Sequence, residues 1–271
     1  MTGRHLSVRS DEVRPLYLAK VSMSPRVLSE QSQADRELEL IQQARLLIER
    51  DGIHALTIDK LVTMVPYSKG TIYNHFGSKE DLLIAVANLC ITEVTELFRR
   101  AMSYMGKSRE RGLVIMLSYL IWARLHPMQL FIVLTAHSPS VVERADDKRT
   151  ERHLQLEGQL MQLVLKVFTD AVEDGDLILP PGMDVQRMVF AMWSAGFGAI
   201  ALVTSKCDCA GAIGFEIERE FFTNVQMMAD GMQWQPMSNQ FDYKAVLRKA
   251  SAELFAEEMR QLEVLGRPLQ F

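Results

Sequence analysis

Helical periodicity is the strongest pattern in this chain from residue 34 onward. Apolar residues recur there at steps of three and four positions, the spacing of one face of an amphipathic helix. The first such run consists of Ala34, Leu38, Ile41, Ala44 and Ile48. Asp51 and Gly52 follow this run, and a glycine just past the last turn ends a helix. We therefore predict a helix from residue 34 to residue 51.

Shorter helices are predicted next, each with its own start signal. Thr57 stands at an N-cap position, where its hydroxyl can accept a hydrogen bond from a helical N–H. The apolar residues after it predict a short helix that Pro66 ends, and Ser68 can cap another from Lys69 to about His75. Gly77 then breaks the chain, and the run at 78–81 resembles a capping box that opens a long helix.

The remaining chain predicts further helices with short breaks between them. We expect them near residues 108–125, 127–137, 141–174, 183–205, 212–234 and 240–265. Residues 1–33 show no sustained period, and we interpret them as a flexible N-terminal arm. The predicted fold class is all-α, with a helix-turn-helix domain at 34–80 and a larger helical domain at 81–271. The two domains share the long helix that begins after residue 77.

Composition adds modest information to this pattern. Hydrophobic residues make up 48% and charged residues 24% of the chain, as in ordinary soluble folded proteins. The net charge is −4, yet residues 60–79 hold three lysines and no acidic residue. Three cysteines fit a reducing cytoplasm. Residues 188–205 carry no charge, but their Ala and Gly content favours a buried helix over a membrane span.

Two short helices joined by a turn and supported by a third helix form a helix-turn-helix. The second helix enters the major groove of DNA, so it needs a buried side and an exposed polar side. Ile72 and Phe76 supply the buried side, and Gly70 lets the backbone approach DNA closely. The exposed side is expected to comprise Lys69, Thr71, Tyr73, Asn74 and His75.

The runs Leu56–Leu61 (LTIDKL) and Ser68–Leu83 (SKGTIYNHFGSKEDLL) resemble the DNA-binding signature of the TetR/AcrR family. The resemblance covers about residues 36–83. It implies phosphate contacts from Thr57, Tyr73, His75 and Lys79, and base contacts from Lys69, Gly70 and Thr71, with Asn74 as a further candidate. Tyr73 and His75 could instead cover the edge of the core. One departure is Pro66, which replaces a glycine usual in the turn and can tilt the recognition helix.

The resemblance also implies that the larger domain binds an effector and forms a homodimer. Apolar and sulfur-bearing side chains are the candidates for an effector pocket, and they could equally be ordinary core. They are Met102, Met105, Met116, Trp122, Met128, Phe131, Met161 and Phe168. Small residues on the helix near 183–205 are the candidates for the dimer interface, with burial inside one protomer as the alternative. They are Ala191, Ala195, Gly196 and Ala199.

The sequence thus predicts a cytoplasmic, ligand-responsive repressor. A small hydrophobic effector would release the homodimer from a palindromic double-stranded DNA operator. A transcriptional activator, or a binding protein that has kept the fold and lost DNA binding, are the alternatives. No Gly-rich phosphate loop or nucleophile elbow favours an enzyme, and no cofactor is expected. We also expect no metal site, because Cys207 and Cys209 lack a second pair and the six histidines are dispersed in sequence.

Overall fold

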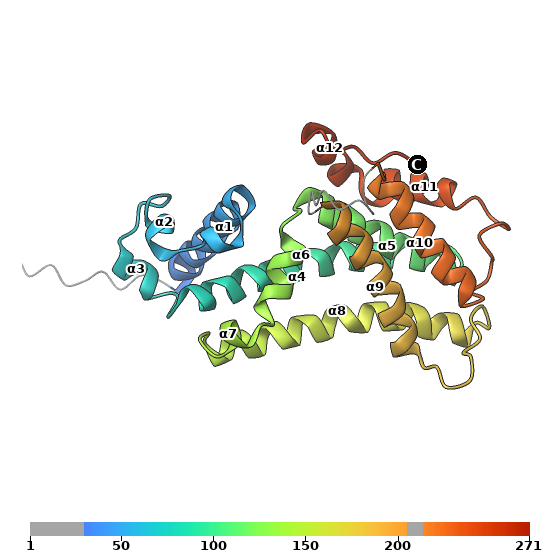
Figure 1. The fold of residues 1–271 in the computed structure, drawn as a ribbon, viewed down its shortest axis with the longest axis horizontal. Coiled ribbons are helices and arrows are strands. Elements are labelled where there is room, and N and C mark those ends of the chain that lie inside the picture. Colours follow the sequence, from blue (N-terminus) through green and yellow to red (C-terminus); the bar gives the residue numbers. More distant parts are fainter. Residues whose placement is uncertain (1–29, 205–213) are drawn as a thin grey trace, which may run out of the picture.

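The computed structural model describes residues 30–204 and 214–271, and these residues form helices joined by turns, without a strand (Figure 1). The predicted all-α fold is confirmed. Our expectations for residues 1–29, and for Cys207 and Cys209, lie outside the described residues. The first three helices form a small domain at one end of the molecule, and α4 leads from it into the larger domain (Figure 1).

The small domain consists of α1 (Glu30–Asp51), a 3-10 turn (Ile53–Ala55), α2 (Ile58–Val62) and α3 (Lys69–Tyr73). Helix α1 begins at Glu30, four residues before the predicted start, so the predicted arm is too long by that stretch. Gly52 ends α1 in the left-handed region (φ +85°), and its N–H bonds the carbonyl of Ile48 at 2.8 Å. The domain core comprises Leu40, Leu47, Ile48, Leu61, Ile72 and Phe76, all fully buried.

The three predicted N-caps are confirmed, whereas the Asp81 carboxylate accepts the N–H of Gly77 and does not close the predicted capping box with Ser78. The Thr57 hydroxyl accepts the N–H of Lys60, Ser68 accepts that of Thr71, and Ser78 accepts that of Asp81. These three caps fix where α2, α3 and α4 begin, and they replace hydrogen bonds that the first turn of a helix lacks.

Two long helices form the centre of the larger domain. Helix α4 (Lys79–Ala101) packs along α5 (Ser108–Leu125), which is buried on nearly every side from Leu113 to Ala123. The chain then bends into α6 (Gln129–Ala136). These bounds agree closely with the predicted helices near 108–125 and 127–137.

Helix α8 (Asp147–Glu173) flanks α4 and α5, and α9 (Val185–Thr204) packs against α10 (Ile217–Gly231). The prediction of one helix over 141–174 is wrong, because the chain breaks after the short α7 (Pro139–Val142). The side chain of Asp146 there caps α8 by accepting the N–H groups of Lys148 and Arg149.

The C-terminal segment also contains a break that the sequence pattern did not predict. Residues 240–265 form α11 (Tyr243–Leu254) and α12 (Ala256–Val264), with the fully buried Phe255 between them in a non-helical conformation. Both helices pack against α5 (Figure 1), so this segment covers the core of the larger domain.

Helix α9 is the one described helix that is long and apolar enough to cross a membrane by itself, with a mean hydropathy of 1.3 over Val185–Val203. Helices α5 and α6 taken together are also long and apolar enough to cross a membrane, but the chain bends by 98° between them. Because core helices of soluble proteins meet the same criterion, and α9 packs along α10, this is weak evidence for a membrane span.

Candidate DNA-binding surface and effector cavity

Seven of the eight predicted DNA-contacting residues are accessible on α2, α3 and the first turn of α4. Tyr73 is 48% exposed, and Lys69, Gly70, Asn74 and Lys79 are also exposed. Thr57 and Thr71 are half-buried, because the first caps α2 and the second lies against the Ser68 hydroxyl at 2.9 Å. The recognition helix therefore has the buried and exposed sides that the sequence predicts.

The two lysines at this surface differ in how far their charge is neutralised. Lys69 Nζ lies 2.6 Å from Asp59 Oδ1, and this hydrogen bond raises the pKa of Lys69. Lys79 Nζ lies 3.9 Å from Glu80 Oε1, a looser contact. A phosphate would have to compete with Asp59 for Lys69, whereas Lys79 reaches solvent more freely.

His75 departs from the prediction of an exposed side chain. Only 11% of its side chain is exposed, and its Nδ1 lies 3.4 Å from Glu37 Oε2 on α1. It sits just beyond the end of α3, where the chain turns inward to place Phe76 in the core. His75 thus contacts the supporting helix, and its predicted place on the exposed side is wrong.

The unusual turn before α3 is fixed by a contact that sequence reasoning missed. The Tyr67 hydroxyl donates to Glu39 Oε2 at 2.5 Å, and the guanidinium of Arg36 lies 4.9 Å from the centre of the Tyr67 ring. Both partners are on α1. The proline turn is therefore held against the supporting helix by the residue that follows Pro66.

Arg149, near the start of α8, joins the two domains. Its Nη1 bonds Glu37 on α1 at 2.7 Å, its Nη2 donates to the carbonyl of His75 at 3.0 Å, and its Nε lies 2.9 Å from Asp81. Asp81 is 3% exposed and also accepts the N–H groups of Gly77 and Asp146. One side chain from the larger domain thus contacts α1, α4 and the end of the recognition helix.

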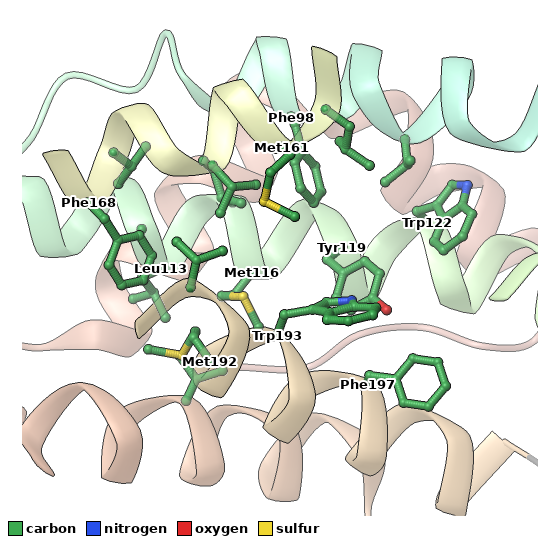
Figure 2. Close-up of a pocket in the computed structure, with 18 of the residues that line it drawn as sticks. Phe98, Leu113, Met116, Tyr119, Trp122, Met161, Phe168, Met192, Trp193 and Phe197 are labelled. Atoms are coloured by element: carbon green, nitrogen blue, oxygen red, sulfur yellow. The ribbon is translucent and has the colours of Figure 1, made fainter. Parts of the chain in front are cut away.

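The larger domain contains a cavity of about 440 Å³. Helices α4, α5, α6, α8, α9 and α10 contribute to its wall, which is almost entirely apolar (Figure 2). Four of the predicted effector-pocket residues line it, namely Met116, Trp122, Met161 and Phe168. All three tryptophans of the chain, Trp122, Trp193 and Trp234, belong to the wall.

The other four predicted pocket residues do not line this cavity. Met105 is 87% exposed in the loop after α4. Met102 and Met128 pack against the core from the end of α4 and the start of α6. Phe131 points away because α6 turns its Leu130, Val133 and Leu134 face toward the cavity. The sequence identified helices that carry apolar residues, but not which side of each helix faces the cavity.

Polar groups are few in the cavity wall. Arg109 is 2% exposed, and its charge is held by Asp230 at 2.6 Å, Gln226 at 2.6 Å and the carbonyl of Trp234 at 2.6 Å. Burial lowers the pKa of Arg109, and Asp230 opposes that shift. This cation already has its partners, so the cavity presents no unpaired cation from Arg109 to an acidic ligand.

The Tyr119 hydroxyl is buried beside Trp193 in the same wall (Figure 2). Burial raises the pKa of Tyr119, and a polar contact with the Trp193 side chain offsets part of the rise. By its geometry, the hydroxyl makes no hydrogen bond within the described protein. A buried unpaired hydroxyl is costly, and a bound molecule with an acceptor group would satisfy it.

The fold also brings together two of the histidines that are far apart in the sequence. His137 at the end of α6 bonds Glu157 on α8, with His137 Nε2 and Glu157 Oε1 2.6 Å apart. The ring of His153 lies beside that of His137, with centroids 5.1 Å apart. Burial lowers the pKa of His153, while Glu157 opposes the shift. His137 and Glu157 are at the same time part of the cavity wall.

Helix α9 presents a different face to solvent from the one predicted. Gly196 and Ala199 are buried inside the protomer, where a Cβ on Gly196 would come within 2.7 Å of Met116 and 3.2 Å of Phe221. Ala191 and Ala195 are half-buried. The prediction that Gly196 and Ala199 meet a partner is therefore wrong. Helix α9 and its neighbour α10 instead expose apolar side chains that are larger than Ala or Gly, among them Phe190 and Trp193 on α9 and Met227 on α10.

Comparison with known proteins supports the resemblance of the small domain. Residues 40–86 match the family model of bacterial regulatory proteins of the tetR family. This range spans the capped helices α2 and α3 and the start of α4, which form the helix-turn-helix. Residues 40–86 therefore form a DNA-binding domain of the tetR type.

Solved structures share the fold of this chain. A protein of unknown function from Rhodococcus sp. RHA1 aligns with a TM-score of 0.60 at 20% identity, covering 73% of this chain and 95% of its own. The TetR family transcriptional regulator PfmR from Thermus thermophilus gives 0.52 at 16%, covering 70% and 96%. The regulator FadR from Bacillus subtilis, in complex with stearoyl-CoA, gives 0.53 at 15%, covering 72% and 98%. No curated protein matches the sequence.

Proposed function

We propose that this protein is a transcriptional repressor of the TetR family, and that its DNA binding is controlled by a small hydrophobic effector in the cavity. One observation carries the proposal, namely that a single helix connects the two sites. The first turn of α4 follows the recognition helix, and Ile91, Val94 and Phe98 of the same helix line the cavity. A ligand that shifts α4 would therefore change the position of α3.

The cavity chemistry supports a mostly apolar effector with a hydrogen-bond acceptor. Its volume is within the usual range for small-molecule sites, roughly 300–1,000 Å³. The acceptor would bond the Tyr119 hydroxyl, which has no hydrogen-bond partner in the described protein. A long acyl chain with a carbonyl group has this character. The stearoyl-CoA held by the similarly folded FadR of Bacillus subtilis makes acyl compounds the first class to test.

DNA binding would require a homodimer, because two recognition helices read half-sites about 34 Å apart. We infer that α9 and α10 form the interface through their exposed apolar side chains. Control would then be allosteric: the two dimer states differ in recognition-helix spacing, and the effector prefers the state that does not fit the operator. A few kcal/mol of differential affinity is enough for such control.

The DNA-binding half of the proposal is tested by enrichment of genomic fragments on the purified protein, followed by sequencing. We expect a palindromic site. Lys79→Ala should weaken binding to all sequences and reduce the slope of log affinity against log salt by about 1 per protomer. Lys244→Ala on α11, far from α3 in the chain, is the matched control. It should leave the DNA affinity and its salt dependence unchanged.

Enrichment of no sequence at low salt would contradict DNA binding and favour a protein that keeps the fold as a binding module. Enrichment followed by increased transcription in a reporter assay would identify an activator instead.

The effector half is tested by intrinsic fluorescence, since every tryptophan lines the cavity. Titration with fatty acids and their CoA thioesters should change the emission and release the protein from its enriched DNA. Tyr119→Phe should weaken effector binding severalfold, because one neutral hydrogen bond contributes about 0.5–1.5 kcal/mol. Met161→Trp should fill the cavity and weaken binding further. An emission change without release of DNA would contradict the allosteric proposal alone.

A further inference from the structure

We propose that His137, His153 and Glu157 bind a divalent transition-metal ion, such as Zn²⁺, at the edge of the cavity. Their donor atoms, two imidazole nitrogens and one carboxylate oxygen, all lie within 4.8 Å of one another. Two histidines and a carboxylate are a common ligand set for zinc and related ions. The inference does not depend on DNA binding or on an organic effector.

The secondary structure brings these residues together. His153 and Glu157 are four residues apart on α8, so their side chains leave the same face of the helix. His137 approaches that face from the end of α6. His153 Nε2 lies 3.8 Å from Glu157 Oε1, and His137 Nε2 lies 2.6 Å from the same oxygen.

These distances fit a site that needs only a small adjustment. Ligand atoms at about 2.0–2.2 Å from a tetrahedral zinc ion lie roughly 3–3.5 Å from one another. The shortest observed separation is slightly smaller and the longest is larger. His137 is 43% exposed, so its side chain has room to rotate toward such an arrangement.

The buried member of the group, His153, provides independent evidence of a missing partner. It is 3% exposed, and its Nε2 has no hydrogen-bond partner within the described protein. The amide of Asn88 donates from Nδ2 to the carbonyl of Arg149, so its Oδ1 accepts from His153 Nδ1 at 2.7 Å. The proton is thus on Nδ1, which leaves an unprotonated Nε2 at 3.8 Å from Glu157 Oε1 and within 4.8 Å of the His137 donor nitrogen.

This arrangement of Asn88 is the kind that supports a ligand histidine in metal sites, where the second ring nitrogen donates to an oxygen. The ion would have three protein ligands, which leaves a fourth position for water or for another donor. Because His137 and Glu157 also line the cavity, that open position lies where a molecule in the cavity can reach it.

The test uses the full chain with Zn²⁺ and Co²⁺ alone. Metal content after equilibrium dialysis, and the visible absorption of bound Co²⁺, should show one ion per chain. His137→Ala and Glu157→Gln should each weaken binding by at least about tenfold, and Asn88→Ala by about 10–100-fold. The two ligand variants change accessible or half-buried side chains, and circular dichroism would verify that both remain folded.

His126→Ala is the matched control, because His126 also faces a glutamate, Glu49, at 2.8 Å. It should leave metal binding unchanged. A double variant, Cys207→Ser with Cys209→Ser, should also keep the ion. Failure of the wild-type chain to retain an ion would overturn the proposal. So would an ion that is kept by His137→Ala and Glu157→Gln but lost when the two cysteines are replaced.

Discussion

Arg109 shows how a charge is accommodated in an apolar cavity wall. It lies 2% exposed, with Asp230 as its only ionic partner among the described residues. Removing one partner of a buried ion pair leaves the other charge uncompensated, which typically costs about 3–5 kcal/mol. We expect Asp230→Asn to reduce the free energy of unfolding by roughly 3 kcal/mol, near the low end because Asp230 is 29% exposed.

Urea denaturation at neutral pH measures this loss. Glu96→Gln removes an exposed partner of Arg99 and is the control, with an expected effect below about 1 kcal/mol. Equal effects of the two variants would contradict a structural role for the buried pair.

The same pair has a defined pH dependence. Burial alone would raise the pKa of Asp230, but hydrogen bonds from Ser238 and Arg109 outweigh it and place the pKa below its ordinary value. A lowered carboxyl pKa stabilises the folded state above the unfolded pKa of about 3.9, and this stabilisation is lost as the pH falls further. The difference between wild type and Asp230→Asn should therefore be full at about pH 6–7 and shrink below about pH 4. If the stability difference between wild type and Asp230→Asn grew on acidification, it would contradict a lowered pKa of Asp230.

Asp59 lowers the positive charge available at the DNA-binding surface. It holds Lys69 at 2.6 Å, and an exposed pair of this kind contributes about 0.2–1 kcal/mol. If the proposed function holds, Asp59→Asn should tighten DNA binding by up to about fivefold, because Lys69 would no longer have to leave Asp59 in order to contact a DNA phosphate. Fluorescence anisotropy with the enriched site measures this, and Glu263→Gln on α12 controls for the change in net charge. Weaker binding of Asp59→Asn would show that the pair positions Lys69 for contact.

Among the elements, α8 has contacts at both domains. Arg149 in its first turns binds Glu37 and Asp81, while residues from Glu157 to Phe168 line the cavity. Arg149→Ala would leave the buried Asp81 without its cation, and we expect faster amide exchange at Gly77 and along α1. Hydrogen exchange followed by mass spectrometry measures this. Arg152→Ala, exposed on the same helix, should leave the exchange of the small domain unchanged; equal acceleration in both variants would contradict a specific role for Arg149.

The elements themselves show what the sequence could predict. Thr57, Ser68 and Ser78 were recognisable as caps because capping depends on residues within three positions of one another. The break at Phe255 was not, because the helical period continues across it and only burial against α5 separates α11 from α12. The contacts of Arg149 with Glu37 and of His137 with Glu157 join distant segments, so they follow from packing that no local pattern records.

The sequence predicted least well which side of each helix faces the core, the cavity or a partner. The small residues of α9 suggested a close helix contact, and the structure places Gly196 against Met116 and Phe221 of its own protomer. Small residues permit close approach but do not say which neighbour approaches. The prediction that Phe131 lines the cavity was wrong for a similar reason. Helix α6 is apolar on all sides, so no polar side marks its outer face.

For the whole molecule, the proposed homodimer is supported by the apolar side chains that the fold leaves exposed. Phe190 on α9 is 64% exposed and Met227 on α10 is 67% exposed, and the two helices pack together. Exposed apolar side chains on neighbouring elements are typical of protein interfaces. We expect Phe190→Glu combined with Met227→Glu to convert a dimer to monomers, because each charge would have to be desolvated in the interface.

Sedimentation velocity at micromolar concentration measures this conversion, and circular dichroism checks that the monomer stays folded. Ile178→Glu is the control, since Ile178 is 75% exposed in the turn between α8 and α9 and should leave the dimer intact. The double variant should also bind the operator more weakly, because a monomer has one recognition helix and contacts only one half-site. A monomeric wild type would contradict the proposed dimer. A dimer that survives the double variant but not Ile178→Glu would place the interface elsewhere on the molecule.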